Sequence, residues 1–232
     1  MTETGSIIKK YLFYLFRDAK LSTGIHLDGG AALYFFYEIN RIFSNDLDFT
    51  AERKSQLSNF INNSLIPLQK VNHGNAKWNL KKIIDTNKII ICINGSQIFH
   101  IDIYYVPPKY CHYQIDNLTL NNESADISLH SLNDIFVEKL LCTITRTETR
   151  DLIDLSEIIF RKNLNSEKVI QMYQLKSGFK NLNIRNLKKY LFSISSIESR
   201  FYLKFPSMRR DIENQFKVMR KFIEQSIMFK FR

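Results

Sequence analysis

The sequence predicts an α+β protein, in which a first half of mixed strands and helices is followed by a helical second half. Short runs of β-branched and aromatic residues, several alternating with polar residues, occur between residues 25 and 106 and are typical of half-buried strands. From Ser131 onward the apolar residues recur three or four positions apart, which is the spacing of a helix face. We therefore expect a core domain at residues 1–130 and a helical domain at residues 131–232.

The expected elements of the first half include both helices and strands. Residues 5–20 are amphipathic, and Ile25-His26-Leu27 is a short run that leads into a pair of glycines. We expect Pro67 to end a helix, because proline cannot extend a helix interior. Asn94-Gly95 is a favoured tight-turn dipeptide and predicts a hairpin. In chain order we expect a helix at 5–20, a strand at 25–27, a helix at 31–42, a strand at 46–50, a helix at 56–68, and strands at 88–94 and 97–106.

The second half is predicted to contain five helices. In the last of them apolar residues from Ile212 to Ile227 recur at steps of four, three, four and four, with charged residues on the other side. Such a stripe indicates core packing rather than a cofactor site. The expected helices cover residues 133–144, 151–161, 166–175, 184–205 and 208–229.

The net charge of +10 is concentrated near the C-terminus. Residues 160–232 contain 17 Lys or Arg against 5 Asp or Glu, so residues 1–159 carry a net charge of −2. Lys and Arg side chains neutralise phosphates and release their counterions, so a basic half suits a polyanionic partner such as a nucleic acid. A solvated, Lys-rich helical surface explains the same composition without such a partner.

The cysteines and the apolar runs predict the compartment. Cys92, Cys111 and Cys142 are far apart and lack the spacing of metal ligands or redox pairs, so we expect reduced thiols in a cytoplasmic protein. The apolar run near the N-terminus is broken at Arg17-Asp18, and no stretch reaches the roughly twenty apolar residues of a membrane span. We expect neither a signal peptide nor a transmembrane helix.

Two aspartates one residue apart are the first candidates for a metal site. Asp46 and Asp48 lie in an expected strand, where alternate side chains share one face, and the hydrophobic residues between and after them face the core. Two carboxylates placed in this way can hold Mg2+. They follow Gly29-Gly30 by about sixteen positions, and bare backbone N–H groups at a strand-to-helix turn can approach a phosphate closely. The combination predicts a site for a metal ion and a nucleoside triphosphate.

Asp102 is the candidate for a third carboxylate on a neighbouring strand. Two metal ions about 4 Å apart need more oxygen ligands than one pair of aspartates supplies. Asp102 is the one acid among strong β-formers, and alternation places it on the same face as His100 and Tyr104. An acid in the middle of a strand is costly unless it binds something. The alternative is an aspartate that faces solvent on a half-exposed sheet.

The helical half contains a further set of charged residues. Lys139 and Thr143 are four positions apart and share one helix face, and Arg150 and Asp154 repeat this spacing on the next helix. Lysine suits triphosphate oxygens, and Asp154 could hold Lys139, contact the nucleotide or accept a proton. The alternative is an ordinary salt-bridge network between two crossing helices.

These blocks resemble the signature of a known family. His26 to Leu33, followed by Arg41 and then Ser44-x-Asp46-Leu47-Asp48, is similar to the Gly-Gly-Thr-Ala-Leu … Arg-x-Ser-x-Asp-hydrophobic-Asp signature of the AbiEii-type nucleotidyltransferases. These proteins are the toxins of abortive-infection and type IV toxin-antitoxin systems. Ala31 stands where the family usually has Thr or Ser.

The downstream block from Glu138 to Leu155 also resembles that family. It reads Glu-Lys … Arg-Asp-x-x-Asp-Leu, with Lys139 and Asp154 at the positions of the family's functional Lys and Asp. The resemblance covers about residues 25 to 160 and implies a nucleotidyltransferase fold, a small mixed β-sheet flanked by helices with a helical C-terminal part. It also implies the transfer of NMP from an NTP to an acceptor hydroxyl, with Mg2+ or Mn2+ as cofactor.

The resemblance implies an RNA end as the acceptor and a cognate antitoxin as a partner. One alternative is transfer to a protein or small molecule. The other is a binding module that keeps the fold without catalysis.

The resemblance also gives each candidate residue an expected role. The catalytic residues would be Asp46, Asp48, Asp102, Lys139 and Asp154, the metal ligands Asp46, Asp48 and Asp102, and the nucleotide-binding residues Gly29, Gly30, Ser44, Lys139 and Arg150.

Overall fold

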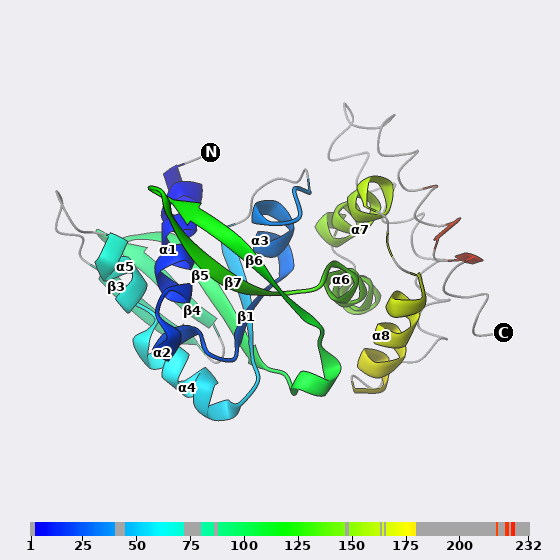
Figure 1. Cartoon of the computed structure of the whole chain (residues 1–232), viewed down its shortest axis with the longest axis horizontal. Coiled ribbons are helices and arrows are strands. Elements are labelled where there is room, and N and C mark those ends of the chain that lie inside the picture. Colours follow the sequence, from blue (N-terminus) through cyan, green and yellow to red (C-terminus); the bar gives the residue numbers. More distant parts are fainter. Residues whose placement is uncertain are drawn as a thin grey trace. The chain divides into compact units, whose positions relative to one another are not determined.

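Figure 1 shows the computed structural model of the chain. Its described residues divide into two compact units: a sheet unit of residues 3–38 and 45–131, and a helical unit of Ile39 and the described residues from Leu132 onward. The expected helix at 184–205, most of the helix expected at 208–229 and the candidate Ser44 lie outside the described residues. The residues that the structure describes are 3–39, 45–71, 80–85, 88–146, 149–162, 164, 166–179, 217, 221–222 and 224–225.

The sheet unit is built on a seven-stranded mixed sheet with the strand order β3-β4-β5-β2-β1-β7-β6. The pairs β2–β5 and β1–β7 are parallel and the other neighbours are antiparallel. This mixed sheet with flanking helices confirms the predicted fold class. The strands are β1 (Ile25–Asp28), β2 (Asp46–Ala51), β3 (Leu80–Asp85), β4 (Lys88–Ile93), β5 (Ser96–Tyr105), β6 (Tyr113–Leu120) and β7 (Glu123–His130).

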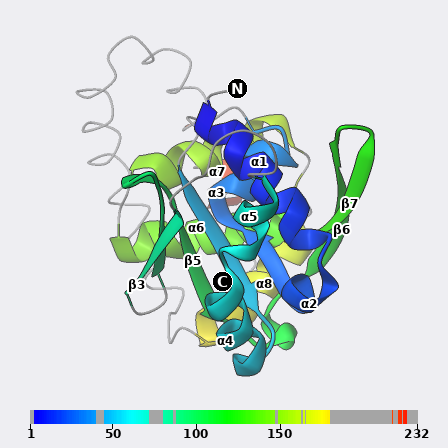
Figure 2. The ribbon, with the colours of Figure 1, turned by 90° about the vertical axis from the view of Figure 1, so that its left-hand side faces the viewer.

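Aromatic side chains join the helices of this unit to one face of the sheet. Phe49 of β2 lies with its ring centroid 6.5 Å from Phe16 and 5.3 Å from Phe60, and Tyr11 lies 5.3 Å from Phe99 of β5. Figure 2 shows α1, α2, α4 and α5 in front of the strands. The helices of the sheet unit are α1 (Glu3–Phe16), α2 (Ala19–Ser22), α3 (Gly29–Phe35), α4 (Lys54–Asn63) and α5 (Ile66–Val71), with a 3-10 turn at Pro108–Tyr110.

The two faces of the sheet differ in polarity because side chains alternate along each strand. In β2 and β5 the residues that face the helices, among them Leu47, Phe49 and Ile101, are fully buried. The alternate residues of the same strands include the half-buried Asp46, Asp48, His100 and Asp102. The fold therefore places a polar row on the sheet face opposite the aromatic core.

Three expected helices differ from the observed ones. The helix expected at 5–20 is two helices, because α1 ends at Phe16 and α2 begins at Ala19. The helix expected at 31–42 ends at Phe35, and Glu38 has a φ of +53°, which a right-handed helix does not allow. The helix expected at 56–68 is two helices, because α4 ends at Asn63 and α5 begins at Ile66. Pro67 starts a helix here rather than ending one, since a missing N–H costs nothing in a first turn.

The strand hairpins are partly predictable. The hairpin of β4 and β5 turns at Asn94 and Gly95, which have φ values of +52° and +82°, and this confirms the predicted turn. The elements expected from the sequence did not include β3 or the hairpin of β6 and β7. The latter turns at Asn121 and Asn122, with φ values of +51° and +64°, so an Asn-Asn pair was the available signal.

The helical unit contains α6 (Leu132–Arg146), α7 (Thr149–Arg161) and α8 (Ser166–Phe179), which confirm three predicted helices. Helix α6 contacts both α7 and α8, and the fully buried side chains of Phe136, Leu155 and Val169 contribute one from each. Among the described residues, no helix combines the length and the apolar character needed to cross a membrane.

Candidate active site

Strand register brings the acids of β1, β2 and β5 into one row on the polar face of the sheet. Asp48 is the register partner of Asp28 on one side and of Asp102 on the other, and Asp46 is the partner of His100. Register partners on neighbouring strands are about 4.8 Å apart, and alternate residues on one strand about 6.6 Å apart. The cluster of Asp28, Asp46, Asp48 and Asp102 is called the carboxylate cluster below.

Gly29 lies so close to the carboxylate cluster that this position requires glycine. It follows β1 directly, has a φ of +62°, and a Cβ atom added to it would lie 2.0 Å from Oδ2 of Asp48. Its backbone N–H donates a hydrogen bond of 2.7 Å to Oδ1 of Asp28. Only glycine tolerates both this backbone conformation and this close approach. Gly30, the second predicted glycine, is buried in the first turn of α3.

Two basic side chains face the carboxylate cluster. His100 Nε2 lies 3.1 Å from Oδ1 of Asp46 and 3.6 Å from Oδ2 of Asp102. Lys88 Nζ, from the next strand, lies 3.9 Å from the same oxygen of Asp102. The sequence predicted that His100 shares this face but assigned it no role. Its position two residues before Asp102 in the same strand was the available indication that it lies beside the acids.

The carboxylate cluster has the donor atoms that a divalent cation needs, and the strand register brings their strands together. Among the described residues, Asp46, Asp48 and Asp102 do not form a group whose ligand atoms all lie within 4.8 Å of one another. Repulsion between like charges favours such divergence. The strand register nevertheless places Asp48 beside Asp102, and the space that a Cβ of Gly29 would fill is taken by the Asp48 carboxylate. Carboxylate oxygens are the ligands that hard divalent cations prefer.

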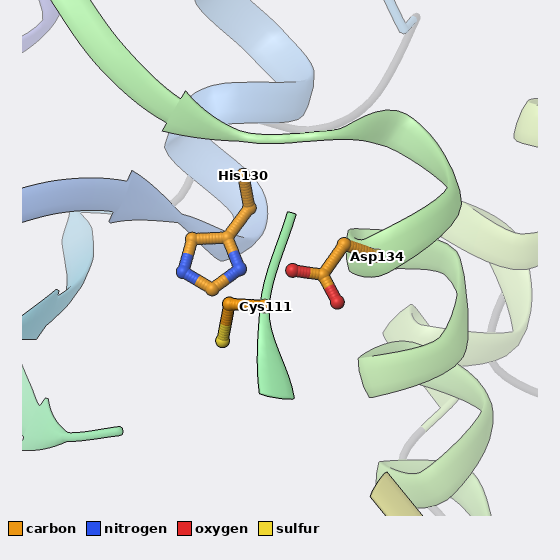
Figure 3. Close-up of side chains that lie close together, drawn as sticks. All are labelled: Cys111, His130 and Asp134. Atoms are coloured by element: carbon orange, nitrogen blue, oxygen red, sulfur yellow. The ribbon is translucent and has the colours of Figure 1, made fainter. Parts of the chain in front are cut away.

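A buried histidine borders the carboxylate cluster on the side of β7. Figure 3 shows His130 beside Cys111, and a ring nitrogen of His130 lies within 4.8 Å of the Cys111 Sγ. His130 Nε2 is 2.7 Å from Oγ1 of Thr50, and its Nδ1 is 4.0 Å from Oδ1 of Asp28. Sequence reasoning assigned no role to Asp28 or His130, because their neighbours come from strands distant in the chain. The third side chain in Figure 3, Asp134, belongs to the helical unit.

A second buried histidine lies on the same sheet face. The ring of His26 stacks on Tyr113 with a centroid separation of 3.5 Å, and its nitrogens lie 2.6 Å from Ser128 Oγ and 3.1 Å from Glu52 Oε1. Burial lowers the pKa of His26 to about 4, and this effect outweighs the opposing attraction of Glu52. Burial also raises the pKa of the Tyr113 hydroxyl. Burial thus favours the neutral forms of His26 and Tyr113.

In the helical unit, Lys139 is enclosed by two carboxylates. Its Nζ donates a hydrogen bond of 2.9 Å to Oδ1 of Asp151 and lies 3.1 Å from Oδ2 of Asp154. All three side chains are buried. The contact of Asp154 with Lys139 is one of the roles that the sequence offered for Asp154. Asp151, the second partner of Lys139, was not predicted, and Arg150 is exposed. The Asp-x-x-Asp spacing, three residues along one helix face, was the signal for Asp151.

A similar arrangement surrounds Lys176 of α8. Its Nζ lies 2.5 Å from Oδ1 of Asp134 and 2.8 Å from Oε1 of Glu138, both on α6. Lys176 and Asp134 are buried, so their charges are offset within the protein rather than by water. The carboxylates of the helical unit thus stabilise the packing of α6 against α7 and α8.

The fold and the family comparison define the class of protein. The family model described as "Nucleotidyl transferase AbiEii toxin, Type IV TA system" matches residues 10–225. The chain therefore belongs to the AbiEii nucleotidyltransferase toxin family, and the resemblance seen in the sequence is confirmed. No curated protein matches the chain.

A solved structure shows a similar fold. MenT4, a nucleotidyltransferase toxin from Mycobacterium tuberculosis H37Rv, superposes with a TM-score of 0.56 at 14% identity over 75% of this chain. The chain spans 63% of the length of that structure, and at this identity the likeness concerns the fold alone. The Megavirus polyadenylate synthase matches with a TM-score of 0.38 and 17% identity, over 68% of this chain and 30% of its own.

Proposed function

We propose that the chain is a toxin-like enzyme that uses a divalent cation to transfer NMP from an NTP to a hydroxyl at an RNA end. The observation that carries this proposal is the contact between Gly29 and Asp48, with Asp102 in register beside them. Membership of the AbiEii family supports the reaction class. We further propose a cytoplasmic location and a cognate antitoxin.

Asp46, Asp48 and Asp102 are the proposed ligands of Mg2+ or Mn2+. A bound cation would offset the charge of the triphosphate and of the transition state. Asp102 also accepts the proton of the attacking hydroxyl. The hydroxyl oxygen then forms a bond to the α-phosphorus, while the bond from this phosphorus to the bridging oxygen breaks and pyrophosphate leaves.

The backbone and the basic residues are proposed to hold the triphosphate. Gly29 and Gly30 offer N–H groups without a side chain to block a phosphate. Lys139 and Arg150 supply positive charge, and the contact of Lys139 with Asp151 and Asp154 fixes its position. Ser44, the last predicted nucleotide contact, keeps the role that the family resemblance implies.

An RNA acceptor is supported by the distribution of charge. Residues 160–232 carry 17 Lys or Arg against 5 Asp or Glu. Phosphate contacts of this kind make affinity fall steeply with salt. Aromatic side chains, of which the chain has 18 Phe and 11 Tyr, can stack on unpaired bases.

The test is label transfer from each α-labelled NTP with Mg2+ or Mn2+, offered tRNA, total RNA or purified protein as acceptor. We expect label in RNA with the wild-type chain and none with Asp48→Ala. Asp126→Asn, which changes an exposed acid of β7, should transfer normally. Label in protein alone would overturn the RNA acceptor. If the wild type and Asp48→Ala both transfer label only at background level to every acceptor, the proposal that the chain is an enzyme is overturned.

A further inference from the structure

We propose that His100 is a ligand of the divalent cation and gives the site a preference for Mn2+ over Mg2+. This inference rests on the proposed function, because it concerns the same cation site. It assigns to the site a nitrogen donor that three aspartates do not provide. It also assigns the protein a preferred class of cation, one that accepts both oxygen and nitrogen ligands.

The position of the imidazole matches that of a ligand. His100 Nε2 lies 3.1 Å from Oδ1 of Asp46 and 3.6 Å from Oδ2 of Asp102, so it bridges two of the predicted metal ligands. Two ligands that each lie about 2.1 Å from one cation and at a right angle are about 3.0 Å apart. The distance from Nε2 to Asp46 is within about 0.1 Å of this value. Among the described residues, Oδ1 of Asp46 and Oδ2 of Asp102 do not lie within 4.8 Å of one another, so a bound cation would draw one of these carboxylates toward the other.

The strand register places the His100 ring beside an acid. Its register partners are Asp46 on β2 and Ile90 on β4, and the latter has no polar side-chain atom. The side chain is 17% exposed, similar to the 24% of Asp46 and the 19% of Asp102. By contrast, both ring nitrogens of His26 face Ser128 and Glu52. The geometry thus directs Nε2 of His100 to the acids that would hold the metal.

The donor set determines which cation is preferred. Mg2+ is a small, hard cation that binds carboxylates and retains its water, whereas imidazole nitrogen suits transition metals. Mn2+ accepts carboxylate ligands as readily as Mg2+ does and also tolerates nitrogen. A site with Asp46, Asp102 and His100 as donors should therefore bind Mn2+ more tightly than Mg2+. Replacement of His100 should affect Mn2+ more than Mg2+.

The test is a binding measurement on the whole chain, without turnover. MnCl2 is added to the purified protein, and electron spin echo envelope modulation detects nitrogen coupled to the bound Mn2+. We expect 14N modulation in the wild type, its replacement by the 15N pattern after labelling with 15N-histidine, and its loss in His100→Gln. The labelled wild type needs no substitution, so the test holds even where a variant folds poorly. His112→Gln, which changes an exposed histidine, should keep the modulation.

Calorimetric titration gives the second readout. We expect the Mn2+ Kd of His100→Gln to rise about 10-fold or more and the Mg2+ Kd to change less than about 3-fold. Bound Mn2+ without nitrogen modulation in the wild type, modulation that persists in His100→Gln, or equal loss for both cations would each overturn the proposal. If RNA is labelled in the presence of Mg2+ but bound Mn2+ shows no nitrogen coupling, this inference is overturned and the proposed function stands. Absence of both cation binding and label transfer overturns the proposed function as well.

Discussion

Acidic side chains occupy two different environments in the sheet unit and in the helical unit. On the sheet, the side chains of Asp46 and Asp102 are 24% and 19% exposed, and their basic neighbours lie at 3.1 to 3.9 Å. In the helical unit the side chains of Asp151 and Asp154 are 0% and 2% exposed and both contact Lys139. The first group is partly open to water. The second is buried with its cation.

This difference predicts different costs of substitution in the two units. A buried charge is tolerated when a partner offsets it, and removal of that partner is costly because the remaining charge stays buried. Partly exposed like charges repel one another, and removal of one relieves the repulsion. Loss of one acid of the carboxylate cluster should therefore leave the sheet unit folded, whereas loss of the buried Lys139 should destabilise the helical unit.

The largest effect is expected from Asp48→Ala. Loss of this central carboxylate should lower the rate of label transfer by about 10³-fold or more, equivalent to about 4 kcal/mol of transition-state stabilisation. The melting temperature should stay equal or rise, because Asp28 and Asp102 lose a neighbouring like charge. A lower melting temperature together with lost activity would assign Asp48 a structural role instead.

Lys139→Met should give the opposite result. The variant leaves Asp151 and Asp154 buried without their cation, so we expect a loss of about 3–5 kcal/mol in the free energy of unfolding, measured by urea titration. Lys168→Met changes an exposed lysine of α8 and should stay within about 0.5 kcal/mol of wild type. Equal stability of the two variants would contradict the distinction between the units.

Gly29→Ala tests whether the carboxylate cluster depends on the backbone. The variant combines a left-handed conformation, at φ +62°, with a Cβ 2.0 Å from the Asp48 carboxylate. We expect about 2–3 kcal/mol of destabilisation and about a 10²-fold loss of transfer rate. Gly95→Ala is the matched control, because its φ is +82° but no atom lies within 4 Å of the added Cβ. Similar activity of both variants would show that Asp48 needs no such support.

The stability of the sheet unit should depend on pH because the buried His26 is neutral in the folded protein. The pKa of His26 is lowered from 6.5 to about 4 in the folded protein, so the unfolded chain binds more protons below pH 6.5. The folded state should lose about 2 kcal/mol between pH 7 and pH 5 and little more below pH 4. Glu52, His130 and Tyr113 surround the ring. His26→Gln should remove this slope and His112→Gln should keep it, as measured by urea titration at each pH.

Much of the candidate site follows from local sequence. The period of two in a strand places Asp46 with Asp48 on one face and Asp102 with His100 on another strand, and both pairs are observed. Glycines after β1 predict the strand-to-helix turn, and Asn94-Gly95 predicts the hairpin. These features depend only on the alternation of side chains and on the conformations that each residue allows.

The tertiary structure decided which strands pair and therefore which polar residues become neighbours. Strands β2 and β5 are paired although more than 40 residues separate them, so no local period indicates that Asp48 lies opposite Asp102 and Asp46 opposite His100. The same holds for His130 beside Asp28, and for Asp151 beside Lys139. The sequence by itself determined the family, the strand faces and the candidate acids. Only the packing of distant segments decided their partners, because burial and strand register depend on the whole unit and not on neighbours in the chain.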